Sequence, residues 1–267
     1  MHNFYFQLTE ELNAEAPIAV LASGQAVVYY RLAIMSKDGD WILEESPAAC
    51  QRVLAVLGGY EARYRPGAPL DVRWLAHGWS SHFELFDAEK RRLRCDFVTR
   101  PPRVAPEELS DLFRPGAAAE PLRVVELEPL IRMKQTQRAK DYPVIGELAR
   151  LLPPEREIQV TTDPDRILAL APSHGAGSQR APVQVATRGG SREDVVVALA
   201  RELDRLQLAD KARVDRYTAA SEAYLREFRA SRIDELPLSE AHPRLCALAQ
   251  RLLPFRPWED PGHADAQ

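Results

Sequence analysis

The sequence has few cysteines, and they form none of the arrangements in which cysteine usually carries function. Cys50, Cys95 and Cys246 are odd in number and widely separated, and no C-x-x-C pair occurs. This pattern argues against a disulfide framework and against a cysteine-based zinc site. We therefore expect the three side chains to be buried, reduced thiols.

Long apolar runs and an excess of positive charge are also missing. No stretch approaches the ~20 apolar residues of a membrane-spanning helix. Residues 1–12 lack the basic and the continuous apolar parts of a secretion signal. These absences predict a cytoplasmic protein that does not enter a membrane. The formal net charge of -4 provides no overall positive field, so nucleic acid binding would require a local basic patch.

Several catalytic motifs are absent as well. The histidines show no H-x-x-H or H-E-x-x-H spacing, which argues against a zinc enzyme. Ser80 and Ser81 lie outside any G-x-S-x-G motif, so serine hydrolase chemistry has no support in the sequence. His77 and His82 flank this segment, and the sequence favours surface histidines over pocket residues. The GAGSQR segment around Gly175 lacks the lysine of a phosphate loop and is expected to be a mobile loop.

The composition is that of a soluble globular chain. Hydrophobic residues make up 45% and charged residues 28% of the 267 positions, with a mean hydropathy of -0.33. These values argue against a disordered or fibrous protein. At roughly 150 residues per domain, the length lies between one large domain and two ordinary ones.

The apolar pattern predicts a mixed α/β region followed by helices. Short apolar runs alternate with helical patterns from residue 18 to about residue 100. The runs at 82–86 and 93–98 are separated by a charged segment, as in a hairpin that supplies two central strands. Helical spacing at 47–59 ends in two glycines, which are typical of a helix stop. Beyond residue 105 the pattern is mostly helical, and Pro143 is expected near the first turn of its helix.

Composition shifts indicate how the chain is divided. A proline-rich turn near residue 153 precedes the Gly-, Ser- and Pro-rich segment 171–182, which marks a boundary or an exposed loop. We predict an α/β domain, a small mixed sheet flanked by helices, over residues 1–153. A mainly helical C-terminal domain would cover 154–255, and 256–267 would be a disordered tail.

Three amphipathic helices are expected near the C-terminal end. Ser191 and Asp194 form a capping box for a helix at 194–208, and two further helices would cover 213–228 and 242–253.

Three aspartates carry the candidate chemistry. Asp38 and Asp40 are two residues apart, so both side chains project from one face of an extended segment. Asp96 lies in an apolar run, where an isolated charge is costly unless a partner or a metal compensates it. Carboxylates converging from adjacent strands are the oxygen ligands that Mg²⁺ uses together with water and substrate phosphates.

These residues also have simpler interpretations. Asp-Gly is a leading type I′ turn dipeptide, and taken alone the segment 37–40 is better explained as a hairpin turn. Asp96 would then form an ordinary salt bridge with Arg94 or with a basic residue of 100–103. The preceding segment raises the odds of a site, because Ser23 and Gly24 lie between a short apolar strand and an apolar helix. Such a turn makes either a backbone anion site or a routine serine N-cap.

In order along the chain, Ser23-Gly24, Asp38-Gly39-Asp40 and Asp96 resemble the signature of the polymerase-beta-like nucleotidyltransferase superfamily. That signature is a Gly-Gly or Gly-Ser turn, a helix, an Asp-x-Asp strand and a third aspartate on a later strand. The sequence looks most like the minimal nucleotidyltransferases and the abortive-infection type toxins. Their Met-Lys and later Lys-Asp have counterparts in Met133-Lys134 and Lys140-Asp141. The resemblance covers about residues 15 to 152.

The resemblance implies a nucleotidyltransferase fold and an activity. Such an enzyme moves a nucleoside monophosphate from a nucleoside triphosphate to an acceptor hydroxyl on RNA, protein or a small molecule. Asp38, Asp40 and Asp96 would be its catalytic residues and would bind Mg²⁺ or Mn²⁺, with Asp96 also activating the attacking hydroxyl. Ser23 and Gly24 would contact the triphosphate, and Lys134 would neutralise phosphate charge. Lys140 and Asp141 would be structural.

Two departures from the family pattern favour a second hypothesis. Gly39 stands where the family usually has a hydrophobic residue, and it would loosen a strand that must hold two ligands. Gln25 follows Ser-Gly and would crowd or replace a phosphate contact. The alternative is a catalytically degenerate protein that keeps the fold and binds a nucleotide or a protein partner, for example in a toxin-antitoxin or defence pair.

Overall fold

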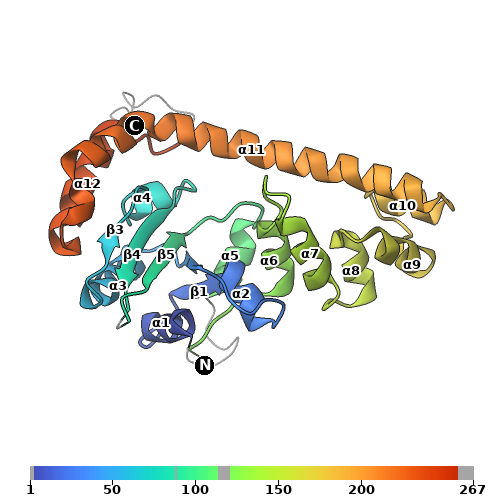
Figure 1. The fold of residues 1–267 in the computed structure, drawn as a ribbon, viewed down its shortest axis with the longest axis horizontal. Coiled ribbons are helices and arrows are strands. Elements are labelled where there is room, and N and C mark those ends of the chain that lie inside the picture. Colours follow the sequence, from blue (N-terminus) through green and yellow to red (C-terminus); the bar gives the residue numbers. More distant parts are fainter. Residues whose placement is uncertain (1–2, 88, 114–120, 258–267) are drawn as a thin grey trace. The chain divides into compact units, whose positions relative to one another are not determined.

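The computed structural model describes residues 3–87, 89–113 and 121–257. It confirms the predicted fold class, a mixed α/β protein with one five-stranded mixed sheet, flanking helices and a long helix toward the C-terminus (Figure 1). Residues 258–267, most of the predicted tail, lie outside the described residues. Among the described helices, none combines the length and the apolar character that crossing a membrane requires.

The chain forms two compact units, and their limits differ from the predicted ones. The first unit comprises Met1–Val125 and Asp215–Gln267, and the second comprises Glu126–Val214. The sequence placed a boundary at residues 153 and 154 instead. The composition shift there marks only a proline at the start of a helix within the second unit, so it does not separate two cores.

The sheet belongs to the first unit. Its strands are β1 (Ala19–Ala22), β2 (Asp38–Leu43), β3 (Arg63–Tyr64), β4 (Ser81–Phe86) and β5 (Arg92–Val98). The spatial order is β1-β2-β5-β4-β3, and β2 pairs with β5 in parallel while the other neighbours are antiparallel. The predicted hairpin of β4 and β5 is therefore confirmed. β5 is the central strand, and β4 is the second strand from an edge.

The helices of the first unit follow local sequence signals. They are α1 (Phe4–Leu12), α2 (Ser23–Tyr29), α3 (Pro47–Gly59), α4 (Val72–Leu75), α5 (Pro106–Asp111) and α12 (Leu238–Leu252), together with the 3-10 helix η1 (Ile233–Glu235). The Ser46 hydroxyl accepts a hydrogen bond from the Ala49 N–H, 3.1 Å away, and so caps α3. α3 ends at Gly59, as the glycine pair predicted.

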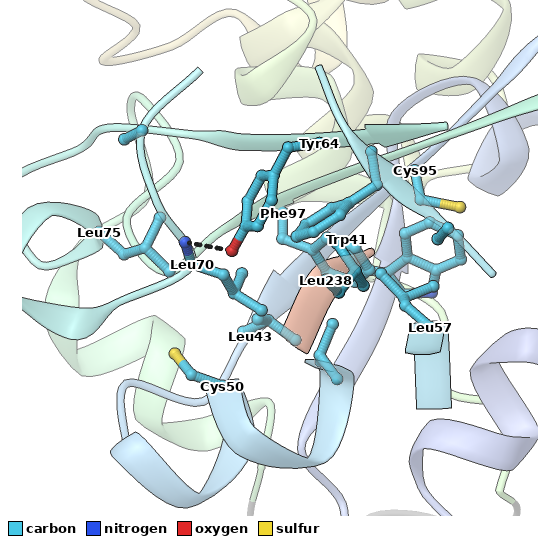
Figure 2. Close-up of a cluster of buried hydrophobic side chains, with 14 of the residues drawn as sticks. Trp41, Leu43, Cys50, Leu57, Tyr64, Leu70, Leu75, Cys95, Phe97 and Leu238 are labelled. Atoms are coloured by element: carbon cyan, nitrogen blue, oxygen red, sulfur yellow. Dashed lines mark hydrogen bonds between the residues drawn. The ribbon is translucent and has the colours of Figure 1, made fainter. Parts of the chain in front are cut away.

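One face of the sheet packs into the main hydrophobic core. Trp41, Phe83, Cys95 and Phe97 come from three strands and are completely buried. The Trp41 and Phe97 rings stack with centroids 5.1 Å apart, and Figure 2 shows them together with Leu57 of α3. Each large side chain buried in this way stabilises the fold by about 1.5 to 3 kcal/mol.

The second unit is helical and has its own core. Its helices are α6 (Leu127–Met133), α7 (Asp141–Ala149), α8 (Pro154–Val160), α9 (Pro164–His174), α10 (Ala181–Thr187) and the first part of α11 (Arg192–Ser231). The core contains Ile158, Ile167, Leu170, Ala171, Val183, Val195 and Leu199. Pro143 lies in the first turn of α7, as predicted. Gly175 is the C-cap of α9, and residues 175–180 connect α9 to α10.

The helices predicted at 194–208 and 213–228 are one helix of 40 residues, α11. The intervening segment 209–212 contains no glycine or proline, and its alanines and lysine favour helix, so nothing ends the helix there. The predicted cap is confirmed. The Ser191 hydroxyl accepts from the Asp194 N–H at 3.2 Å, and the Asp194 carboxylate accepts from the Ser191 N–H at 3.0 Å.

Candidate functional site

Asp38, Asp40 and Asp96 lie on two neighbouring parallel strands. Asp40 of β2 stands opposite Asp96 of β5, and Asp38 stands opposite Arg94. Residues opposite each other project from the same face of the sheet, and so do residues two apart on one strand. The three carboxylates therefore emerge from one face. The hairpin turn at 37–40 is excluded, because Asp38–Leu43 is a strand.

This face, called the polar face below, is opposite to the core face. Strand alternation and the pairing register give it a row of charged or half-buried side chains across β2, β5 and β4. Its members are Asp38, Asp40, His82, Glu84, Arg94 and Asp96.

Gly39 is required by packing on the core face. A Cβ atom at this position would lie too close to Trp41 Cη2 and only 2.5 Å from Tyr5 Cδ1. The rings of Tyr5 and Trp41 thus occupy the space of the hydrophobic side chain that the resemblance led us to expect. β2 is paired with β1 on one side and β5 on the other, which holds the strand in place. The expected loosening by Gly39 has no counterpart in this arrangement.

Tyr5 also fixes the start of β2. Its hydroxyl donates a hydrogen bond of 2.8 Å to the Lys37 carbonyl. Burial, followed by the negative charges of neighbouring groups that include Asp38 and Asp40, raises the pKa of Tyr5 to about 12. Tyr5 therefore stays a neutral donor at physiological pH.

Ser23 and Gly24 lie beside the aspartates. Ala22 at the end of β1 pairs with Asp40, and Ser23 follows it as the first residue of α2. The N-cap of α2 is Ala22, and no side chain caps the helix, so the interpretation of Ser23 as a routine N-cap is wrong. Ser23 has a positive φ of 50°, and a Cβ at Gly24 would collide with Ser36 Oγ. The turn is tight and close to β2.

Gln25, which departs from the family pattern, ties this turn to its surroundings. It is buried, and its amide donates to the Ser36 carbonyl at 3.0 Å and accepts from Asn3 Nδ2 at 3.1 Å. One end of the amide thus holds the segment that leads into β2, and the other end holds Asn3 at the start of α1.

Basic side chains of the protein lie next to two of the three aspartates. Asp96 Oδ1 lies 2.8 Å from His82 Nδ1 and 3.4 Å from Arg65 Nη1. Asp38 Oδ1 lies 3.6 Å from Arg94 Nη1. The proposed pairing of Asp96 with Arg94 or with 100–103 is therefore replaced by pairing with His82 and Arg65. At about a quarter exposed, the Asp96 pair with Arg65 contributes no more than about 1 kcal/mol.

The aspartates supply the oxygen atoms that a divalent cation prefers, and they share one face of the sheet. Asp38 Oδ1 is buried and accepts no hydrogen bond, which is costly for a carboxylate oxygen and is relieved by a cation. Within the described part of the chain, however, no group of three His, Cys, Asp or Glu side chains is arranged to hold a metal. Asp38 and Asp96 would have to turn away from Arg94 and His82 to join Asp40 around an ion.

Lys134 belongs to the second unit. It is buried at the C-cap of α6, and its predicted contact with phosphate stays a prediction. Asp141 is also buried. Its carboxylate accepts hydrogen bonds from Thr136 Oγ1 at 2.5 Å and from Arg138 Nε at 2.9 Å, so its surroundings are those of a structural residue. Lys140 is exposed at the N-cap of α7.

Sequence reasoning missed Arg65 and His82 as neighbours of Asp96, and Ser80 as a neighbour of His82. The Ser80 hydroxyl lies 2.9 Å from His82 Nε2, on the side of the ring away from Asp96. The signal was present, because Ser80 and His82 are two residues apart at the start of β4 and so share a face.

Two cavities of the first unit lie away from the aspartates. The larger, of about 1020 Å³, is lined by the end of α3 and the start of α12, with Tyr60, Phe86 and His242 among its residues. The smaller, of about 410 Å³, is lined by residues that include Glu45, Arg100 and Phe113. Neither has an aspartate of the candidate site in its wall.

No family model matches the sequence, and no curated protein matches it either. Among solved structures, the chain is similar to the crystal structure of a "putative nucleotidyltransferase" from H. pylori. The identity is 14%, the match covers 78% of this chain and 94% of that chain, and the TM-score is 0.40. A likeness this distant adds nothing to what the residues of the site show, so the function is inferred from those residues.

Proposed function

We propose that the protein is a nucleotidyltransferase that moves a nucleoside monophosphate from a nucleoside triphosphate to an acceptor hydroxyl, using Mg²⁺ or Mn²⁺. One observation supports this most directly. Asp38 and Asp40 share a face of β2, and Asp96 stands beside Asp40 on the parallel strand β5. The acceptor is RNA, a protein or a small molecule.

In this proposal each of the candidate site residues has a role. Asp38 and Asp40, with Asp96, would hold the ion, which when bound stabilises the leaving pyrophosphate and activates the nucleophile. Asp96 would also orient the acceptor hydroxyl and draw its proton as the oxygen attacks the α-phosphorus. Ser23 and Gly24, next to Asp40 through the β1–β2 pairing, would contact the triphosphate.

Lys134 would neutralise phosphate charge. This role concerns binding of the triphosphate and not of the metal ion, so the Lys134→Ala variant tests it without changing the aspartates. We expect a higher KM for the triphosphate in this variant.

The proposal is tested by incubating the protein with each labelled nucleoside triphosphate, Mg²⁺, and cellular RNA or protein. We expect label transfer and pyrophosphate release. Asp38→Asn and Asp40→Asn should each reduce both by at least about 100-fold, since even residues that only orient a metal ligand are worth about 10- to 100-fold.

Glu84→Gln is a matched control. Glu84 is a carboxylate on the same polar face, and it pairs with Arg92 at 3.6 Å rather than with the candidate site. This variant should keep its activity. Absence of transfer in the wild type, or equal activity in Asp38→Asn, Asp40→Asn and wild type, would refute the proposal.

A second candidate is a catalytically degenerate member that binds a nucleotide or a protein partner, as in a toxin-antitoxin or defence pair. It is favoured by the basic side chains beside Asp38 and Asp96, since Arg94 and Arg65 already compensate these carboxylates and His82 contacts Asp96. In that case calorimetry with a triphosphate would show binding without pyrophosphate release. Binding would also survive in Asp38→Asn.

A further inference from the structure

A serine, a histidine and an aspartate form a continuous chain of contacts on the polar face. Ser80 Oγ lies 2.9 Å from His82 Nε2, and His82 Nδ1 lies 2.8 Å from Asp96 Oδ1. The order of atoms is that of a Ser-His-Asp relay, which is recognised by geometry rather than by sequence position. We infer that Ser80 is the nucleophile of such a relay and accepts an acyl group from a carboxylic ester.

The two ring nitrogens of His82 have different neighbours, which sets their roles. Asp96 is negative, so it favours the tautomer with the proton on Nδ1. Nε2 then carries the lone pair and accepts the proton of the Ser80 hydroxyl. Nδ1 is buried, and although Asp96 Oδ1 is near, the N–H is not well directed at it, so the contact is chiefly electrostatic.

The backbone around the relay is held by a network of hydrogen bonds. The Ala68 N–H donates to the Ser80 carbonyl at 3.0 Å, and the Arg65 N–H donates to the His82 carbonyl at 2.8 Å. Between them, Gly67 leaves room for the imidazole, since a Cβ there would collide with His82 Cδ2 and lie 3.1 Å from the Ser80 carbonyl oxygen. The ring thus lies against a fixed backbone, as a preorganised base requires.

The inferred reaction is an acyl transfer followed by hydrolysis. Ser80 Oγ bonds to the carbonyl carbon while its proton passes to His82 Nε2. The bond to the alkoxy oxygen then breaks, and the alcohol leaves with that proton. Water hydrolyses the acyl-serine in the same way and releases the acid. Arg65, whose Nη1 is 3.4 Å from Asp96 Oδ1, would help to hold the Asp96 carboxylate beside His82.

This activity needs neither a nucleotide nor a metal, so its test is independent of the proposed transferase. Without added divalent cations, the protein is treated with diisopropyl fluorophosphate. Ser80 Oγ forms a bond to phosphorus, the P–F bond breaks, fluoride leaves, and the hydroxyl proton passes through His82 to solvent. Peptide mass spectrometry then locates the adduct. We expect it on Ser80 in the wild type and none there in Ser80→Ala.

His82→Asn should slow the labelling of Ser80 by about 100-fold, within the range of a general base. Ser110→Ala is the control, because the Ser110 hydroxyl donates only to a backbone carbonyl, that of Glu107 at 2.7 Å. In Ser110→Ala, Ser80 should be labelled at the same rate as in the wild type. Gly67→Ala keeps all three relay residues but displaces the imidazole. It should slow labelling while the melting temperature shows that the protein is folded.

The ester specificity is tested with p-nitrophenyl acetate, which the wild type should hydrolyse at least about tenfold faster than Ser80→Ala. Equal rates would overturn the assignment of an ester substrate. No adduct on Ser80 in the wild type, or equal labelling rates in wild type and folded His82→Asn, would overturn the relay itself.

Discussion

Single residues in the candidate site serve packing and chemistry together, and Gly39 shows this most clearly. It separates two aspartates on the polar face, while its other side accommodates Trp41 and Tyr5. Trp41 is fully buried and donates its indole N–H to Thr9 Oγ1 at 2.8 Å, so it cannot move freely. The glycine therefore allows two metal-ligand candidates to lie over a rigid aromatic core.

Gly39→Ala should destabilise the protein by about 1 to 3 kcal/mol, since overpacking in a filled core costs this much. Gly58→Ala is the matched control, because a Cβ at Gly58 in α3 meets no atom within 4 Å. In a helix, alanine is favoured over glycine by about 1 kcal/mol, so this variant should be more stable than wild type. Urea unfolding measures both. Equal urea midpoints of unfolding for Gly39→Ala and wild type would contradict the proposal that Gly39 leaves space for Trp41 and Tyr5.

Cysteine residues give a prediction on pH. All three are free; Cys50 and Cys95 are buried as expected, while Cys246 is only partly buried. Burial, followed by the charge of Asp71, raises the pKa of Cys50 from 9.0 to about 12. The fold therefore favours the neutral thiol. This stabilisation is complete below about pH 9 and is lost as the pH rises toward 12, because the unfolded chain gives up its proton first.

The free energy of unfolding should accordingly fall between about pH 9 and pH 11, and Cys50 should contribute a slope of at most about 1.4 kcal/mol per pH unit. Cys50→Ala should show a shallower decrease than wild type over this range. Urea titrations at several pH values measure the slope. The same slope in both proteins would show that the thiol does not titrate differently in the two states.

Among elements, the hairpin of β4 and β5 shows what the sequence could specify. Alternation placed the apolar side chains of both strands on one face, and the charged link between them indicated a hairpin. Once Phe86 pairs with Arg92 at its end, four further steps along each strand bring His82 opposite Asp96. The relay was thus within reach of sequence reasoning, although the hairpin register had to be assumed.

The parallel pairing of β2 with β5, in contrast to the hairpin, could not be predicted from local sequence signals. Residues 44–91 separate these strands, so no local signal fixes their register. The alternation in Asp38-Gly39-Asp40 predicted a shared face, but only the long-range pairing sets Asp96 beside Asp40. The ion pair of Asp38 with Arg94 follows from the same register and was missed for that reason.

On the scale of the whole molecule, the two units were hard to predict because the first is discontinuous. Its C-terminal part, from Asp215 onward, shares a helix with the second unit, since α11 spans Arg192–Ser231. Local composition cannot show that a single helix contributes to two cores. The separate clusters around Trp41 and around Ile167 are what distinguish the units.

Because the two cores are separate, we predict that a destabilising substitution in one core lowers the stability of that unit first. Ile167 is fully buried in the second core, and Ile167→Ala should cost about 2 to 5 kcal/mol. Of the four tryptophans, Trp41, Trp74 and Trp79 lie in the first unit and Trp258 lies outside the described residues. The fluorescence of the three described tryptophans follows the first unit, while circular dichroism follows the helices of both units.

In Ile167→Ala we therefore expect the circular dichroism transition to move to a lower temperature than the fluorescence transition. Val53→Ala, in the first core, should instead lower the fluorescence transition at least as much. Coincident shifts of both signals in Ile167→Ala would mean that α11 couples the units into one cooperative structure.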